Sequence, residues 1–216
     1  LAKLLCVSTL NIKQIVSGVI EVNLVGGDQS AQGQRIVLQK LNNFTVNLRL
    51  LVDGKPFYPV SIYVSWYSDQ MLEDIINSPF NTVMCYRHMT REQLDRLHAA
   101  GKKVIYSIKD VLLGRPACPK EIVDDKTEYA WVDNHVKTFK DHPAILAWYI
   151  NDELGPEWLD KLQVRYDHVR AIDPDHPAFM VLYQIGKINQ YAGTYDVMGT
   201  DPYPVAGKEP KPISMV

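Results

Sequence analysis

From residue 57 onward, the chain alternates between short apolar runs and segments that carry helix caps or helical periodicity. The apolar runs predict six strands, over residues 57–66, 80–86, 103–108, 144–150, 178–183 and 196–200. Helices are predicted between them, over residues 68–77, 90–100, 127–140, 156–172 and 185–191. Strands separated by helices pair in parallel, because each helix carries the chain back to the edge where the previous strand began. The alternation therefore predicts an α/β fold with a parallel sheet that is buried on both faces.

Two architectures accommodate this alternation, a doubly wound open sheet and a (β/α)8 barrel. A doubly wound nucleotide-binding sheet carries a glycine-rich phosphate loop after its first strand. Here the turn at residues 66–69 reads WYSD and contains no glycine. We therefore expect a (β/α)8 TIM barrel. Because a full barrel needs about 250 residues, we expect about six of its eight strand–helix units in this chain, with the rest missing at the C-terminus.

Residues 1–55 follow a different pattern from the rest of the chain. Short, partly alternating runs at residues 19–25, 35–39 and 44–50 predict strands with turns between them. The pair Asp53-Gly54 is typical of a tight hairpin. Such a series of short strands is typical of a β-sandwich. We therefore predict two domains, a partial β-sandwich segment over residues 1–55 and a partial barrel over residues 56–216.

Composition and charge exclude several classes of protein. The 216 residues are 46% hydrophobic and 22% charged, with a net charge of −2, so neither disorder nor binding to nucleic acid is expected. No apolar run reaches the roughly 18 residues that a membrane span requires. The three cysteines and six histidines lack the spacing of a metal site, and we expect neither metal nor cofactor. A glycosylation sequon at Asn43 slightly favours a secreted or extracellular location.

In a barrel of this type, functional side chains lie at the carboxyl ends of the strands. Polar and aromatic residues follow the predicted strands here, and this set suits sugars, because aromatic rings stack on sugar rings while carboxylates and amides bind hydroxyl groups. The candidate binding residues are Tyr63, Trp66, Arg87, His88, Asn151, Asp152, Tyr183, Asp201 and Tyr203. A structural role at the rim is an equal alternative for Arg87 and His88, and Lys109 with Asp110 is expected to form a salt bridge.

The fourth predicted strand ends in polar residues after a long apolar run. Strict alternation along this strand places Tyr149, Asn151 and Glu153 on one side and Trp148 on the opposite side. A carboxyl on an apolar wall beside a second acid has a raised pKa, which suits a general acid. The alternative is that Asp152 or Glu153 caps the helix that follows.

Residues 142–153, HPAILAWYINDE, resemble the fourth strand of the clan A glycoside hydrolases, retaining (β/α)8 enzymes that include the β-galactosidase and β-glucuronidase family. In that family the strand ends in Asn-Glu, and the Glu is the catalytic acid/base. The resemblance implies this role for Glu153, and it places Asp152 where the family has the Asn that binds the sugar 2-hydroxyl. Residues 52–63 also resemble the junction of sandwich and barrel in these enzymes, and residues 201–204 resemble the end of a sixth strand.

The resemblance implies a retaining glycoside hydrolase that acts on O-glycosidic bonds of a carbohydrate. The family's nucleophile is a Glu at the end of strand seven, which falls beyond residue 216, so the chain would need the missing barrel segment in cis or from another chain. Alone it is then expected to be inactive, with Asp201 a minor alternative nucleophile. The competing hypotheses are a non-catalytic carbohydrate-binding barrel protein, which Asp152 favours, and a metal-dependent barrel hydrolase.

Overall fold

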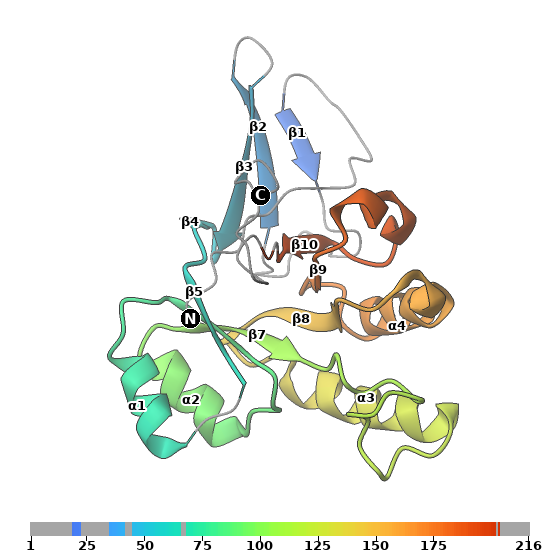
Figure 1. Ribbon diagram of the computed structural model, residues 1–216. Helices are drawn as coiled ribbons and strands as arrows, with labels where there is room; N and C mark the ends of the chain where they lie inside the picture. The colour runs from blue at the N-terminus through green and yellow to red at the C-terminus, as the bar shows by residue number, and fades with distance from the viewer. Residues whose placement is uncertain (1–18, 23–34, 42–44, 66–67, 202, 204–216) are drawn as a thin grey trace.

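The computed structural model describes the backbone of residues 19–22, 35–41, 45–65, 68–201 and 203, and the side chains from residue 50 onward except that of Ile185. Its strands form two sheets (Figure 1). The first sheet pairs four strands antiparallel in sequence order, β1 (Val19–Val22), β2 (Arg35–Leu41), β3 (Thr45–Val52) and β4 (Lys55–Phe57). Much of residues 1–55 lies outside the described ranges, so the β-sandwich and the domain boundary stay predictions.

The second sheet contains six parallel strands that neighbour one another in the order of the sequence. They are β5 (Ser61–Val64), β6 (Thr82–Cys85), β7 (Lys103–Ser107), β8 (Ile145–Asp152), β9 (Ala178–Leu182) and β10 (Val197–Thr200). This order excludes a doubly wound sheet, in which the strand order reverses at a switch point. The sheet curls into a half-barrel with its helices on the outer side (Figure 1), which is consistent with the predicted partial barrel.

The described helices are α1 (Asp69–Ile76), α2 (Arg91–Ala99), α3 (Asp125–Phe139) and α4 (Leu159–Ile172), with the 3-10 helices η1 (Pro156–Trp158) and η2 (Ile185–Tyr191). The first three α-helices, α1, α2 and α3, follow residues whose side chains cap them. Ser68 Oγ accepts the Met71 N–H at 3.2 Å, and Thr90 forms a capping box with Gln93. Within the described ranges, no helix combines the length and the apolarity that a membrane span requires.

The prediction for the first barrel strand, residues 57–66, is wrong in its N-terminal half. Residues 55–57 form β4 of the antiparallel sheet, and β5 begins only at Ser61. The reason is the turn before β4, where Asp53 and Gly54 have φ values of +51° and +72° and Val52 pairs with Lys55. Two positive φ values in a two-residue loop define the tight hairpin that the sequence predicts. Because of this hairpin, residues 55–57 pair with β3 and do not form part of the first barrel strand.

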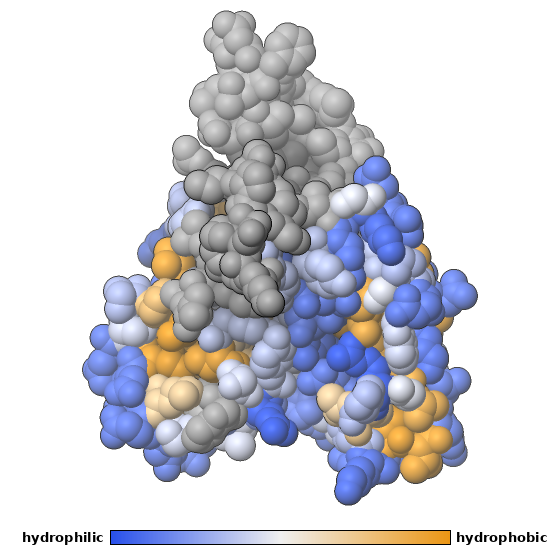
Figure 2. Space-filling model, in the orientation of Figure 1, coloured by the Kyte–Doolittle hydropathy of each residue, from blue (hydrophilic) through white to orange (hydrophobic). Residues whose placement is uncertain are grey.

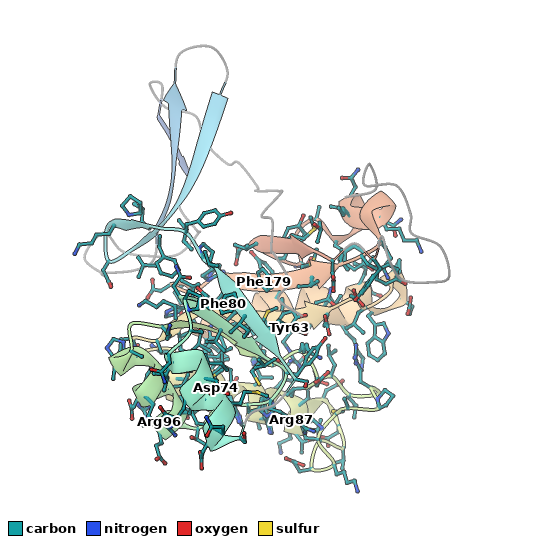
Figure 3. All side chains as sticks on the ribbon, turned by 60° about the vertical axis from the view of Figure 1, so that its left-hand side comes forward. Tyr63, Asp74, Phe80, Arg87, Arg96 and Phe179 are labelled. Carbon is teal, nitrogen blue, oxygen red and sulfur yellow. The ribbon has the colours of Figure 1, made fainter. Side chains whose placement is uncertain are left out.

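Two apolar layers lie on opposite faces of the parallel sheet. The outer layer, against α1, α2 and α3, includes Val83, Cys85, Tyr106, Trp148 and Ile150. The inner layer includes Met84, Ile105, Tyr149, Phe179 and Val181, with Tyr63 packed against it (Figure 3). The predicted opposite directions of the two aromatic residues of β8 are confirmed, because Trp148 lies in the outer layer and Tyr149 in the inner one.

A bulge near the end of β8 changes which side chains face inward. Tyr149 pairs with Phe179 and Asn151 pairs with Met180, so that Ile150 is an extra residue on β8. Asn151 Nδ2 consequently lies 3.8 Å from Met180 Sδ, whereas the Tyr149 hydroxyl donates to Asp152. The prediction that Asn151 shares a side with Tyr149 is therefore wrong, since the bulge shifts the alternation by one residue and turns Asp152 inward.

Candidate active site

Glu153 follows β8 directly, at the carboxyl edge of the parallel sheet. Its φ is +57°, a left-handed conformation that costs a non-glycine residue about 1–2 kcal/mol. The backbone is held there by the Glu153 N–H, which donates to the Val181 carbonyl of β9 at 2.9 Å. Backbone strain of this kind concentrates at functional sites, where the surrounding structure maintains it.

Asp152 and Glu153 do not cap the helices that follow them, so this alternative is wrong. The N-cap of η1 is Gly155 and that of α4 is Trp158, and neither helix has a side-chain cap hydrogen bond. The buried Asn151 closes the turn instead, because its Oδ1 accepts the Leu154 N–H at 3.1 Å. The two carboxylates are thereby left for contacts with residues from neighbouring strands.

Glu153 meets residues that follow β10, fifty positions later in the chain. The Tyr203 hydroxyl oxygen lies 2.8 Å from Glu153 Oε1 and 2.9 Å from Asp201 Oδ2. Desolvation first, and then the two carboxylates, raise the pKa of Tyr203 above its ordinary value, so the phenol keeps its proton. Three strand-end groups thus converge through one hydroxyl, as the barrel rule predicts for residues at this edge.

Asp152 forms a second group with Tyr149 of β8 and with Lys109, which follows β7. Its Oδ1 accepts from the Tyr149 hydroxyl, and its Oδ2 lies 3.3 Å from Lys109 Nζ. The same ammonium lies 3.0 Å from Asp110 Oδ1, which confirms the predicted salt bridge, and 4.0 Å from the centre of the Tyr86 ring. The Lys109 side chain is only 6% exposed, so this ion pair is largely removed from water.

Two tyrosines connect these groups across the inner side of the sheet. The rings of Tyr63 and Tyr86 lie 4.6 Å apart and nearly perpendicular. Burial first, and then the charges of Asp152 and Glu153, raise the pKa of Tyr86 to about 12, while its hydrogen bond with Tyr63 opposes the rise. The charge of Glu153 therefore acts on the same phenol that lies against Lys109, so the two groups belong to one site.

The other candidates occupy three different places. Tyr183 follows β9, and its ring meets that of Tyr203 edge to face with centres 6.2 Å apart, both half exposed. His88 follows β6 but packs against Trp131 of α3, with ring centres 4.5 Å apart, so it lies on the outer side. Arg87 is exposed and lies apart from Phe179 in Figure 3.

Trp66 lies outside the described residues, so its role as a sugar platform stays a prediction. In the part of the chain that is described, no three His, Cys, Asp or Glu side chains gather as a metal-ligand group. Figure 2 shows hydrophilic surface in the middle of the visible face, between the α1–α2 side and the α3 side, with apolar areas beside it. Carboxyl, ammonium and phenol groups next to aromatic rings can bind hydroxyl groups and exchange protons with them.

Three residues of the site are missing from the candidates chosen by sequence. The rule that strand ends carry function selects Arg87, yet Tyr86, one position earlier, is the side chain near Glu153. Lys109 is expected only as a partner of Asp110, and its contact with Asp152 depends on the bulge in β8. Alternation already predicts that Tyr149 faces the same side of the sheet as the candidate acid Glu153, so Tyr149 could have been added to the candidates.

Solved structures with a similar fold include glycoside hydrolases. A glycosyl hydrolase family 2 member from Bacteroides cellulosilyticus is 15% identical over 70% of this chain, with a TM-score of 0.56. A β-glucuronidase from Bacteroides uniformis is 12% identical over 71% of the chain, with a TM-score of 0.57. A β-glucuronidase from Parabacteroides merdae is 11% identical over 78%, with a TM-score of 0.52.

These likenesses define the fold class. The chain has a glycoside hydrolase-like fold, and it spans 23%, 22% and 26% of the length of the three solved chains. No protein-family model matches the sequence, and the search of curated proteins gives no match.

Proposed function

We propose that this chain supplies the acid/base part of the active site of a retaining glycoside hydrolase that cleaves O-glycosidic bonds. The observation that carries the proposal is the contact of 2.8 Å between the Glu153 carboxyl and the Tyr203 hydroxyl, at a strand-end rim of aromatic rings and carboxylates. The likeness of the fold to family 2 glycoside hydrolases supports it, as does the left-handed backbone of Glu153.

In the proposed mechanism, the Glu153 carboxyl donates its proton to the leaving glycosidic oxygen and later removes a proton from the attacking water. A second carboxylate, about 5 Å away, attacks the anomeric carbon. We propose that a Glu beyond residue 216 is this nucleophile, in the same polypeptide or in another chain that completes the barrel. The present chain would then bind a sugar without hydrolysing it.

The proposed sugar contacts come from the residues around Glu153. The half-exposed rings of Tyr183 and Tyr203 offer apolar faces to a sugar ring. Asp152 accepts from Tyr149 and Lys109 and has lone pairs left for a sugar hydroxyl. We propose that these side chains orient the sugar so that its glycosidic oxygen reaches Glu153.

A non-catalytic carbohydrate-binding barrel protein is the second candidate. Asp152 favours it, because a carboxylate can accept a hydrogen bond from a sugar hydroxyl but cannot donate one as the family's Asn does. The residues encoded after position 216 distinguish the two candidates. A Glu at the end of a seventh strand supports the hydrolase, whereas its absence supports the binding protein.

The variant Glu153→Gln tests the hydrolase directly. It is assayed on a panel of aryl glycosides, in a polypeptide that includes the residues after position 216. On the glycosides whose leaving groups need protonation, we expect kcat/KM to fall about 10²- to 10⁴-fold, because the amide transfers no proton to the leaving oxygen. Glu157→Gln is the matched control, since Glu157 is an exposed residue of η1. Equal activity of the two variants would remove Glu153 from the mechanism.

A further inference from the structure

One hydroxyl group connects two carboxyl groups at the rim. The Tyr203 hydroxyl oxygen is within hydrogen-bond distance of Glu153 Oε1 and of Asp201 Oδ2, at 2.8 and 2.9 Å. A phenol carries a single proton, so it donates fully to only one of the two oxygens. Both contacts become full hydrogen bonds when the other carboxyl is protonated and donates to the phenol oxygen. The geometry therefore fits a pair of carboxyl groups that retains one additional proton.

We propose that Asp201, Tyr203 and Glu153 form a proton relay that shares one proton between the two carboxyl groups and protonates Glu153 before the glycosidic oxygen departs. The O–H bond of protonated Asp201 breaks as the phenol oxygen takes that proton. The original O–H bond of the phenol breaks at the same time, and its proton forms the new O–H bond on the Glu153 carboxylate. Tyr203 ends neutral, one proton has moved, and the negative charge has passed from Glu153 to Asp201. The use of this relay in catalysis rests on the proposed function.

Strand β9 fixes the two ends of the relay relative to each other. The Glu153 N–H donates to the Val181 carbonyl at 2.9 Å, and the Asp201 N–H donates to the Leu182 carbonyl at 3.0 Å. Both carboxyl-bearing residues are therefore held by consecutive carbonyl groups of the strand between them. The ring of Tyr183, which follows the same strand, packs edge to face on the Tyr203 ring. The two carboxyl-bearing residues are thus attached through their backbones to a regular strand, which keeps donor and acceptor in register.

Titratable groups at several strand ends surround the relay. Tyr86, which follows β6, senses the charge of Glu153, Asp152 is the last residue of β8, and Tyr183, which follows β9, contacts Tyr203. The ammonium of Lys109, after β7, lies 3.3 Å from the Asp152 carboxylate and also pairs with Asp110, so part of the nearby negative charge is compensated. Asp201 is the carboxyl group that shares a hydroxyl with Glu153, and its removal is expected to change the titration of Glu153 most.

The test is a pH titration of the Glu153 carboxyl carbon by NMR in the chain labelled with carbon-13 at glutamate side chains, assigned with Glu153→Gln. In the native chain, we expect Glu153 to titrate in two coupled steps, since interacting carboxyl groups share their macroscopic pKa values. In Asp201→Asn, a single step is expected, with its midpoint lower by about one pH unit. In Tyr203→Phe, which removes the shared hydroxyl but keeps both carboxyl groups, the separation between the two steps is expected to shrink. Tyr183→Phe is the matched control and should leave both steps in place.

The result that would overturn the relay is a Glu153 titration of one step with the same midpoint in the native chain, Asp201→Asn and Tyr203→Phe. Spectra of each variant report whether it is folded. If Tyr203→Phe unfolds, the titration of Asp201→Asn, which keeps the shape of the side chain, tests the relay by itself. The titration needs no substrate. Coupled titration, together with no glycoside hydrolysis by the polypeptide that includes the residues after position 216, would refute the proposed function alone. Hydrolysis by that polypeptide with an uncoupled Glu153 would refute the relay alone.

Discussion

Removing the ammonium of Lys109 should destabilise the chain through the carboxylates that it neutralises. Lys109 Nζ lies 3.0 Å from Asp110 Oδ1 and 3.3 Å from Asp152 Oδ2, and the three side chains are 6%, 22% and 17% exposed. Breaking a fully buried pair costs about 3–5 kcal/mol, because an uncompensated charge is left behind. Since both carboxylates keep some contact with water, we expect Lys109→Met to cost about 2–3 kcal/mol.

The partner variant separates this charge effect from lost packing. Lys109→Met takes the cation away from Asp152, whereas Asp110 keeps Arg115 Nη2 at 3.7 Å from its Oδ1. Asp152→Asn removes the charge of Asp152, so the double variant should be less destabilised than the two single effects together. We expect a coupling of about 1–2 kcal/mol in this double-mutant cycle. The control is Lys137→Met, because Lys137 forms an exposed pair with Asp133 at 2.6 Å, for which a loss of under about 1 kcal/mol is expected.

The assay is urea unfolding followed by circular dichroism, with thermal unfolding as a second measurement. In a chain of this size, about 1 kcal/mol lowers Tm by roughly 2–4 °C, so Lys109→Met should lower Tm by about 4–12 °C. Additive effects of Lys109→Met and Asp152→Asn would refute the reasoning, because they would show that the ammonium and the Asp152 carboxylate do not stabilise each other. A loss as small as that of the Lys137 control would refute it as well.

Two further predictions concern the outer layer. Arg165→Met should cost about 3–5 kcal/mol in urea unfolding, since it leaves the buried carboxylate of Glu128 without its charge partner, and a cost below about 1 kcal/mol would contradict this. Although burial opposes it, the hydrogen bonds from His176 and Trp148 lower the pKa of Asp173. The resulting stability is present above the unfolded pKa of about 3.9 and is lost as pH falls through the lower folded pKa. Asp173→Asn should therefore flatten the dependence of unfolding free energy on pH below about 4, and an unchanged slope would contradict this.

Local chemistry allowed much of the half-barrel to be predicted from the sequence. Ser68 and Thr90 begin helices where their hydroxyl groups accept backbone N–H groups, and these interactions span only three residues. Asp53-Gly54 makes its turn for a similarly local reason, because these residues tolerate positive φ. The absence of glycine after the first barrel strand also favoured a barrel over a doubly wound sheet, and the sequential strand order excludes the doubly wound sheet.

The arrangement of the site could be predicted only in part, because it depends on contacts between residues that are far apart in the sequence. The barrel rule selects Glu153, Asp201 and Tyr203 as strand-end residues, but their shared hydroxyl depends on the register of β8, β9 and β10. The bulge at Ile150 has no local signal in an apolar run, and it reverses the inward and outward directions expected for Asn151.

The central claim is that Glu153 is the acid/base of a glycoside hydrolase, and chemical rescue tests it most directly. The measurement uses Glu153→Ala in a polypeptide that includes the residues after position 216, with an aryl glycoside whose leaving group needs no protonation. We expect added azide to restore turnover and yield a glycosyl azide, because the anion replaces the water that Glu153 would activate. Turnover of Glu153→Ala at the native rate, with no glycosyl azide formed, would contradict the account.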